Sequence, residues 1–240
     1  MRIFIYFAAA CLLWASQALA GEVHVIGMHC QVRADCKATE LENLLEDAYG
    51  RIGVAVEFVY LPGLRDLDKT NHGELDGSGL RTSIVVEKYP NIIKVPVPLF
   101  TTSLVAVTTN GNVRIQDLKD LHGLLTGVLR GDLIASSVAS ENNADLHRLD
   151  HLSNGLKMLI EGRLDVVFAA KSMLNITMDR FPDTDFSVSK DLYKIQVYHV
   201  VNNKHAHLVP LLARSFREMI DEGVMEQYLE RLYPGISKEP

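Results

Sequence analysis

The chain has 240 residues, with 24 Lys and Arg against 30 Asp and Glu, and a formal net charge of −6. A mildly acidic chain without a basic run argues against nucleic acid as a partner. The length suffices for one large domain or two lobes of ordinary size, and the sequence shows neither internal repeats nor low-complexity segments.

The amino terminus has the pattern of a cleaved secretory signal peptide. Arg2 precedes an apolar stretch over residues 3–14, and the small-residue ending Ala18-Leu19-Ala20 follows. The alternative is a membrane anchor, but the stretch is shorter than the ~20 residues that cross a bilayer. We therefore predict a signal peptide over residues 1–20 and a mature, soluble, monomeric protein in the periplasm.

Two cysteines, Cys30 and Cys36, are left after removal of the signal peptide, which contains Cys11. In an oxidising compartment, a pair this close in sequence predicts a local disulfide. The alternative is two free, buried thiols.

β-rich and helical segments alternate along the mature chain, which predicts an α/β sheet. The first part has strand-like segments at 22–27, 54–60, 92–97 and 104–108, and a helix beginning near Thr39. After a break at 109–112, the pattern restarts with a helix at 115–121, strands at 124–129 and 164–169, and a helix at 153–161. A strand at 194–201 and an amphipathic helical tail follow.

This order predicts a second α/β unit inserted into the first. We expect residues 21–108 to form the first part of lobe one, 109–198 to form lobe two, and 199–240 to return to lobe one. Two strand crossings, near 104–109 and 196–202, would form the hinge.

Three passages resemble the extracellular solute-binding proteins of family 3. They are GELDG (73–77) leading to YPNIIKVPVPL (89–99), IQDLKDL (115–121) followed by GVLRG (127–131), and LIEGRLDVV (159–167). The resemblance spans essentially the whole mature chain and implies a two-lobed periplasmic-binding-protein-like fold that holds a small molecule between its lobes.

The ligand-binding pattern of that family is only partly present. Val86-Glu87-Lys88 stands where the amino-acid binders have a T-x-x-R segment, and Ala170 stands where they have an acid five residues after the lobe-two Asp. The sequence therefore resembles a divergent branch, and a standard α-amino-acid site is not expected.

Candidate ligand-binding residues lie where strands are expected to end, because ligands of open α/β sheets bind at the carboxyl ends of strands. Arg81 could hold a carboxylate with its planar guanidinium; the alternative is a surface Arg paired with Asp76 or Glu87. Arg130 and Gly131 precede an expected helix, whose amides attract anions, or they form a plain turn. The remaining candidates are Met28, His29, Tyr60 and Ser78.

No metal or cofactor is expected. His147 and His151 have the i, i+4 spacing of zinc ligands on a possible helix, and His205 and His207 form a second cluster, but the spacing fixes no third ligand.

The expected function is capture of a small polar or anionic solute, amino-acid-like or an organic acid, for an ABC-type membrane permease. The alternative is a ligand-binding subunit that acts on a membrane sensor. An enzyme of the periplasmic dehydratase kind ranks third, because it would need a cleft carboxyl group of raised pKa. Only Asp76 and Glu74 are candidates for that group.

Overall fold

The computed structural model describes residues 23–29, 38–109 and 113–233. The predicted signal peptide and both cysteines of the predicted disulfide, Cys30 and Cys36, lie outside the described residues. Within that part of the chain, no helix is long and apolar enough to cross a membrane.

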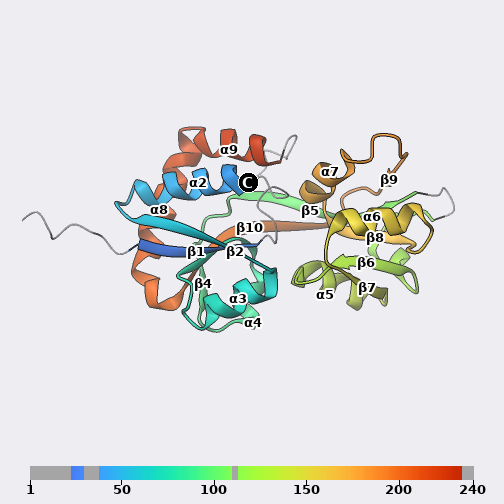
Figure 1. Cartoon of the computed structure of the whole chain (residues 1–240), viewed down its shortest axis with the longest axis horizontal. Helices are drawn as coiled ribbons and strands as arrows, with labels where there is room; N and C mark the ends of the chain where they lie inside the picture. Colours follow the sequence, from blue (N-terminus) through green and yellow to red (C-terminus); the bar gives the residue numbers. More distant parts are fainter. Residues whose placement is uncertain (1–22, 30–37, 110–112, 234–240) are drawn as a thin grey trace, which may run out of the picture.

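One mixed sheet runs through the whole molecule, in the order β2-β1-β3-β10-β5-β8-β6-β7, with β4 paired to β10 and β9 to β5. The strands are β1 (Val23–His29), β2 (Ala55–Leu61), β3 (Gly77–Thr82), β4 (Ile92–Lys94), β5 (Phe100–Thr108), β6 (Leu125–Leu129), β7 (Asp145–Leu149), β8 (Val166–Ala170), β9 (Ser187–Val188) and β10 (Tyr193–Asn202). Figure 1 shows that the sheet and its covering helices form two lobes.

The helices lie on both faces of the sheet in each lobe. They are α2 (Ala38–Gly50), α3 (Gly63–Asn71), α4 (Ile84–Lys88), α5 (Leu133–Glu141), α6 (Leu152–Ile160), α7 (Lys171–Met178), α8 (Val209–Asp221) and α9 (Val224–Leu232), with 3-10 turns η2 (Leu118–Leu121) and η3 (Asn203–Leu208).

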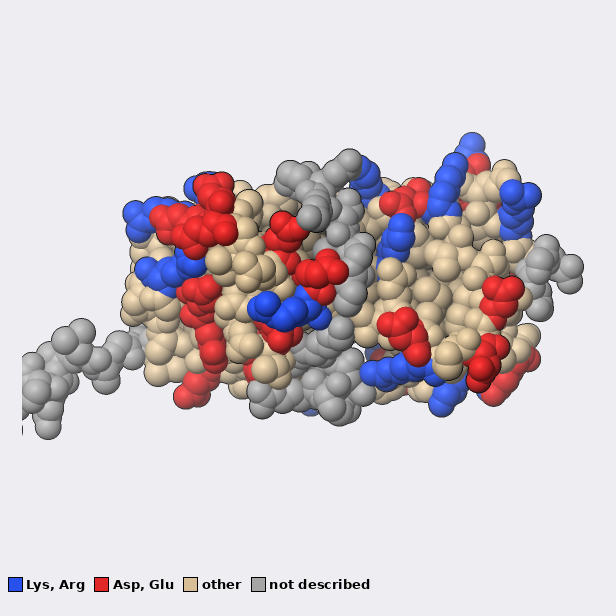
Figure 2. All heavy atoms as spheres, turned by 90° about the horizontal axis from the view of Figure 1, so that it is seen from above, with Lys and Arg blue, Asp and Glu red and all other residues tan. Residues whose placement is uncertain are grey.

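Lobe one is built on the parallel strands β2, β1 and β3. Helices α2, α8 and α9 cover one face, and α3 and α4 cover the other (Figure 1). The larger core lies under α2 and α8, where Tyr49 and Phe216 are fully buried. Figure 2 shows acidic and basic side chains interspersed over both lobes on the face in view.

Lobe two is built on β8, β6 and β7, which are also parallel. Two apolar clusters lie on opposite faces of these strands. Helix α5 contributes Ala135 and Val138 to one cluster, and α6 contributes Leu156 and Leu159 to the other. Burial of both faces explains why the β8 sequence is apolar throughout.

Strands β5 and β10 connect the lobes. They pair antiparallel from Phe100↔Val197 to Leu104↔Tyr193. Beyond this pairing, β5 continues beside β8 in lobe two, and β10 continues beside β3 and β4 in lobe one. The predicted two-lobed α/β fold is confirmed. The predicted limits at residues 108 and 198 stay a prediction, since each lies in a strand that both lobes share.

Two local predictions were wrong. The helix expected at 115–121 is only the short turn η2, because the Asp117 side chain caps the amide of Lys119 and stops a helix from extending backward. His147 and His151 do not share a helix. His147 lies in β7, which pairs with β6, and His151 is the residue before α6.

Candidate functional site

A cleft of about 300 Å³ lies between the lobes. Lobe one lines it with residues that include Met28, His29, Tyr60, Leu64, Leu80 and Tyr233, and lobe two with residues that include Leu129, Arg130, Asp150, His151, Met173 and Arg180. The cleft lies at the carboxyl ends of β1, β2, β6 and β7, which is where open α/β sheets bind ligands.

A second hollow, of about 420 Å³, lies at β5 and β9 in lobe two, beside Arg114 and Lys190. It is larger, but residues of one lobe alone line it. The cleft is the better candidate site because two lobes and four strand ends meet there.

The lobe-one wall of the cleft is mainly apolar. Met28 is buried, Leu41 and Leu80 are partly buried, and Leu64 is an exposed apolar side chain of the same wall. The phenol of Tyr60 donates a hydrogen bond to the buried carboxylate of Glu42. This bond fixes the Tyr60 ring against α2, so that wall of the cleft is formed before any ligand binds.

His29 is a polar side chain of the lobe-one wall. Burial, and then the nearby charge of Arg81, lowers the pKa of His29 to about 3. The imidazole is therefore neutral at ordinary pH and offers one donor and one acceptor. A Cβ atom on Gly63 would lie 2.9 Å from His29 Nε2, so this glycine provides the space that the ring occupies.

The lobe-two wall carries the charges. Arg130 Nε lies 2.9 Å from Asp150 Oδ1, and both side chains are more than half exposed. Arg180 also lines the cleft. Among the described residues, the charged side chains of the lining are thus two arginines and one aspartate, all from lobe two.

Two helices begin at the cleft, one from each lobe. Pro62 precedes α3 and His151 precedes α6, and neither side chain caps its helix. The first amides of an α-helix have no acceptor within the helix and carry a partial positive charge. Both lobes therefore present polarised N–H groups to the cleft.

Arg81 and Ser78 do not line the cleft. The Arg81 guanidinium is buried within lobe one, where it pairs with the fully buried carboxylate of Asp66. Arg81 Nε also donates to Ser78 Oγ at 2.8 Å, and that hydroxyl donates to Asp66 at 2.7 Å. The partner is thus Asp66 on α3, in place of Asp76 or Glu87, and the guanidinium points into lobe one.

Gly131 lies at the contact between the lobes. Its φ of +89° is a backbone conformation that favours glycine, and a Cβ atom there would come within 3.4 Å of Leu64 in lobe one. The adjacent Leu133 packs against the lobe-one cluster that contains Leu67 and Val85. The Asp132 side chain caps α5 by accepting a hydrogen bond from the amide of Ala135.

The structure thus brings Met28, His29, Tyr60 and Arg130 together at the cleft, and it adds residues that the sequence analysis missed. Asp150 and His151 follow β7, and Arg180 follows α7; neither element was predicted. Leu64 was missed because α3, which begins at Gly63 directly after Pro62, was not predicted.

No family model matches the chain. A curated protein of Shewanella oneidensis, named "Uncharacterized protein", is 22% identical over 198 residues, which cover 79% of this chain and 74% of that protein.

Solved structures of binding and sensor domains share the fold. A histidine kinase sensor domain with similarity to periplasmic binding proteins has a TM-score of 0.79 at 15% identity, covering 92% of this chain and 99% of its own. The GluR0 ligand-binding core in complex with L-glutamate has a TM-score of 0.77 at 14% identity, covering 89% and 99%. An ancestral arginine-binding protein bound to arginine has a TM-score of 0.72 at 18% identity, covering 88% and 97%.

The chain therefore has the fold of two-lobed, periplasmic-binding-protein-like domains. The three similar structures are binding or sensor proteins by name. At the level of the fold, the resemblance seen in the sequence is confirmed.

Proposed function

We propose that this protein captures a small organic anion with an apolar body in the cleft between its lobes. The observation that carries the proposal is the composition of the lining: apolar side chains come from both lobes, and the arginines Arg130 and Arg180 come from lobe two. A ligand that bridges the two walls would draw the lobes together about β5 and β10, as in hinge closure around a solute.

The anionic group of the ligand is inferred from three features on one side of the cleft. Arg130 and Arg180 are the arginines of the described lining, and α6 begins at the same wall with no side-chain cap. An anion would compete with Asp150 for Arg130, whose exposed ion pair is weak in water. A carboxylate fits the planar guanidinium geometry.

We further propose that the protein works in the periplasm as a monomer and delivers its solute to the permease of an ABC-type uptake system. The fold supports ligand capture, and the amino-terminal sequence supports export. A sensor subunit acting on a membrane receptor is the second candidate, favoured by the similarity to a histidine kinase sensor domain. A permease and an ATPase encoded beside the gene would support transport; a kinase gene would support signalling.

Capture without turnover fits the cleft better than catalysis. The two candidates for the carboxyl group that a dehydratase-like reaction would need, Asp76 and Glu74, do not line the cleft. Asp150 does line it, but hydrogen bonding from Arg130 lowers the pKa of that carboxyl group. A general acid needs the opposite shift.

A thermal-shift screen of the mature protein tests the ligand class, because a compound that binds only the native state raises the melting temperature. The panel pairs each aliphatic or aromatic carboxylate with its neutral amide, and includes amino acids and polyamines. We expect carboxylates with an apolar body to raise the melting temperature and their amides to do so far less. Equal shifts with the amides, or larger shifts with polyamines, would contradict the proposal.

A further inference from the structure

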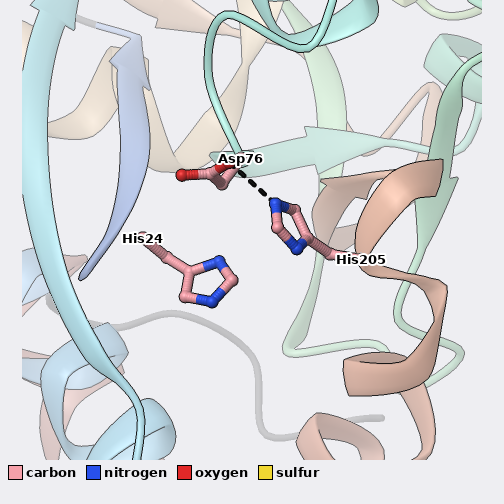
Figure 3. A group of neighbouring side chains, drawn as sticks. All are labelled: His24, Asp76 and His205. Atoms are coloured by element: carbon pink, nitrogen blue, oxygen red, sulfur yellow. Dashed lines mark hydrogen bonds and ion pairs between the residues drawn. The ribbon is translucent and has the colours of Figure 1, made fainter. Parts of the chain in front are cut away.

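Three potential metal ligands meet in lobe one, at the end of the sheet opposite the cleft. His24 lies near the start of β1, Asp76 directly precedes β3, and His205 lies in η3 (Figure 3). Their ligand atoms all lie within 4.8 Å of one another. His29, at the other end of β1, is five residues from His24, or roughly 16 Å along the strand.

The three side chains are already held close to a coordinating arrangement. His205 Nε2 lies 2.7 Å from Asp76 Oδ1, and the ring centroids of His24 and His205 are 4.4 Å apart. Nitrogen and oxygen atoms bound to one tetrahedral Zn²⁺ at about 2.0–2.1 Å are about 3.3 Å apart. Binding would thus open the His205–Asp76 distance by only ~0.6 Å.

The carboxylate is oriented by the backbone of the neighbouring strand. The Val25 amide donates to Asp76 Oδ2 at 2.7 Å, and the Asp76 amide donates to the Val25 carbonyl at 2.8 Å. These bonds leave Oδ1 facing His205 and Lys204. Such supporting hydrogen bonds are a usual feature of protein metal sites.

We propose that His24, Asp76 and His205 bind one divalent transition-metal ion of the zinc class, with solvent as the fourth ligand. Two imidazoles and one carboxylate are a ligand set that suits Zn²⁺. Both histidines are more than nine-tenths buried, so the ion would be enclosed by protein on their side.

Lys204 would compete with the metal for the carboxylate of Asp76. Its Nζ lies 2.8 Å from Asp76 Oδ1 and also donates to the Gly73 carbonyl at 2.7 Å. In the metal-bound state the ammonium leaves Asp76, and the imidazole of His205 carries its N–H on Nδ1, so that Nε2 is free to bind the metal. Without a metal, the same residues form a hydrogen-bonded network in which Lys204 supplies the positive charge. If the three residues bind a metal, removal of the Lys204 charge should strengthen metal binding. If they form only the hydrogen-bonded network, it should not.

Isothermal titration calorimetry of the mature protein with ZnCl₂, after alkylation of its cysteines, distinguishes a metal site from a network of hydrogen bonds alone. We expect one Zn²⁺ per chain and a higher melting temperature in Zn²⁺. His24→Gln and His205→Gln should each weaken binding at least tenfold. Lys204→Gln should strengthen it, and His122→Gln, a matched change at an exposed histidine of lobe two, should leave it unchanged.

Co²⁺ provides an optical readout of the same site, because its visible spectrum reports the number of ligands. A four-coordinate spectrum that is lost in His24→Gln supports the site even if His205→Gln fails to fold. No zinc heat in the wild-type protein would overturn the proposal. So would equal affinity in His24→Gln and the His122→Gln control, or weaker binding in Lys204→Gln.

Discussion

The buried pair of Asp66 and Arg81 gives the sharpest test of how lobe one is held together. Asp66 is fully buried and Arg81 is 6% exposed, so neither charge is solvated by bulk water. Asp66→Asn keeps the shape of the side chain but removes the counterion of Arg81. The guanidinium would then be a buried charge supported only by neutral groups such as the Ser78 hydroxyl.

The expected cost is large. Removing one partner of a buried ion pair typically destabilises a protein by about 3–5 kcal/mol, because the remaining charge has lost its partner in a medium of low dielectric constant. The matched control is Asp191→Asn at the Lys171–Asp191 pair, whose side chains are both 47% exposed. An exposed pair of this kind contributes less than about 1 kcal/mol.

Urea denaturation, followed by circular dichroism, measures both free energies of unfolding. Arg81→Met and the double variant complete a mutant cycle. If the loss comes from the unpaired charge, the double variant should be more stable than the sum of the single changes predicts, by about 1–3 kcal/mol. An Asp66→Asn protein that loses no more stability than Asp191→Asn would refute the reasoning.

Three further predictions concern protonation and space. Burial lowers the pKa of His29 to about 3 and that of His199 to about 4, so unfolding takes up protons below pH 6.5. The stability from these neutral rings should be complete above pH 6.5 and fall as the pH drops toward 4, and His29→Gln should flatten that slope in denaturation series. The pKa of Asp76 is lowered from 3.8 to about 2, so its contribution should be present above pH 4 and be lost between about pH 4 and 2, a loss that acid titration of Asp76→Asn should not show. Gly63→Ala should displace the His29 ring and weaken ligand binding in calorimetry, whereas Gly50→Ala, where a Cβ atom meets nothing within 4 Å, should not.

The sequence was sufficient for the fold because alternating apolar segments and turn residues are local signals. The β10 segment, for example, is a run of β-branched and aromatic residues that ends at Asn202. Helix α3 was missed because Pro62 and Gly63 suggest a turn, although Pro is also compatible with the residue before a helix. Strand β7 was missed because Asp145-Leu146-His147-Arg148-Leu149 is a polar edge strand with little apolar periodicity.

Only part of the candidate site could be predicted, because some of its features depend on contacts between distant segments of the chain. The rule that ligands bind at the carboxyl ends of strands pointed to Met28, His29 and Arg130, which line the cleft; their role in ligand binding stays a prediction. It could not show that Arg81 turns inward, because Asp66 is fifteen positions away on an unpredicted helix. The cluster of His24, Asp76 and His205 comes from three distant segments, and only the folded sheet brings them together.

Calorimetry with variants from both lobes tests the central claim, that a small molecule is held between them. The ligand is the strongest carboxylate from the thermal-shift panel. His29→Gln changes lobe one and Arg130→Gln changes lobe two; His72→Gln and Arg163→Gln are exposed controls on the same two lobes. We predict that both cleft variants weaken binding about tenfold or more, which corresponds to about 1.4 kcal/mol, while both controls bind as the wild-type protein does. A ligand whose affinity is unchanged in either cleft variant would contradict the claim.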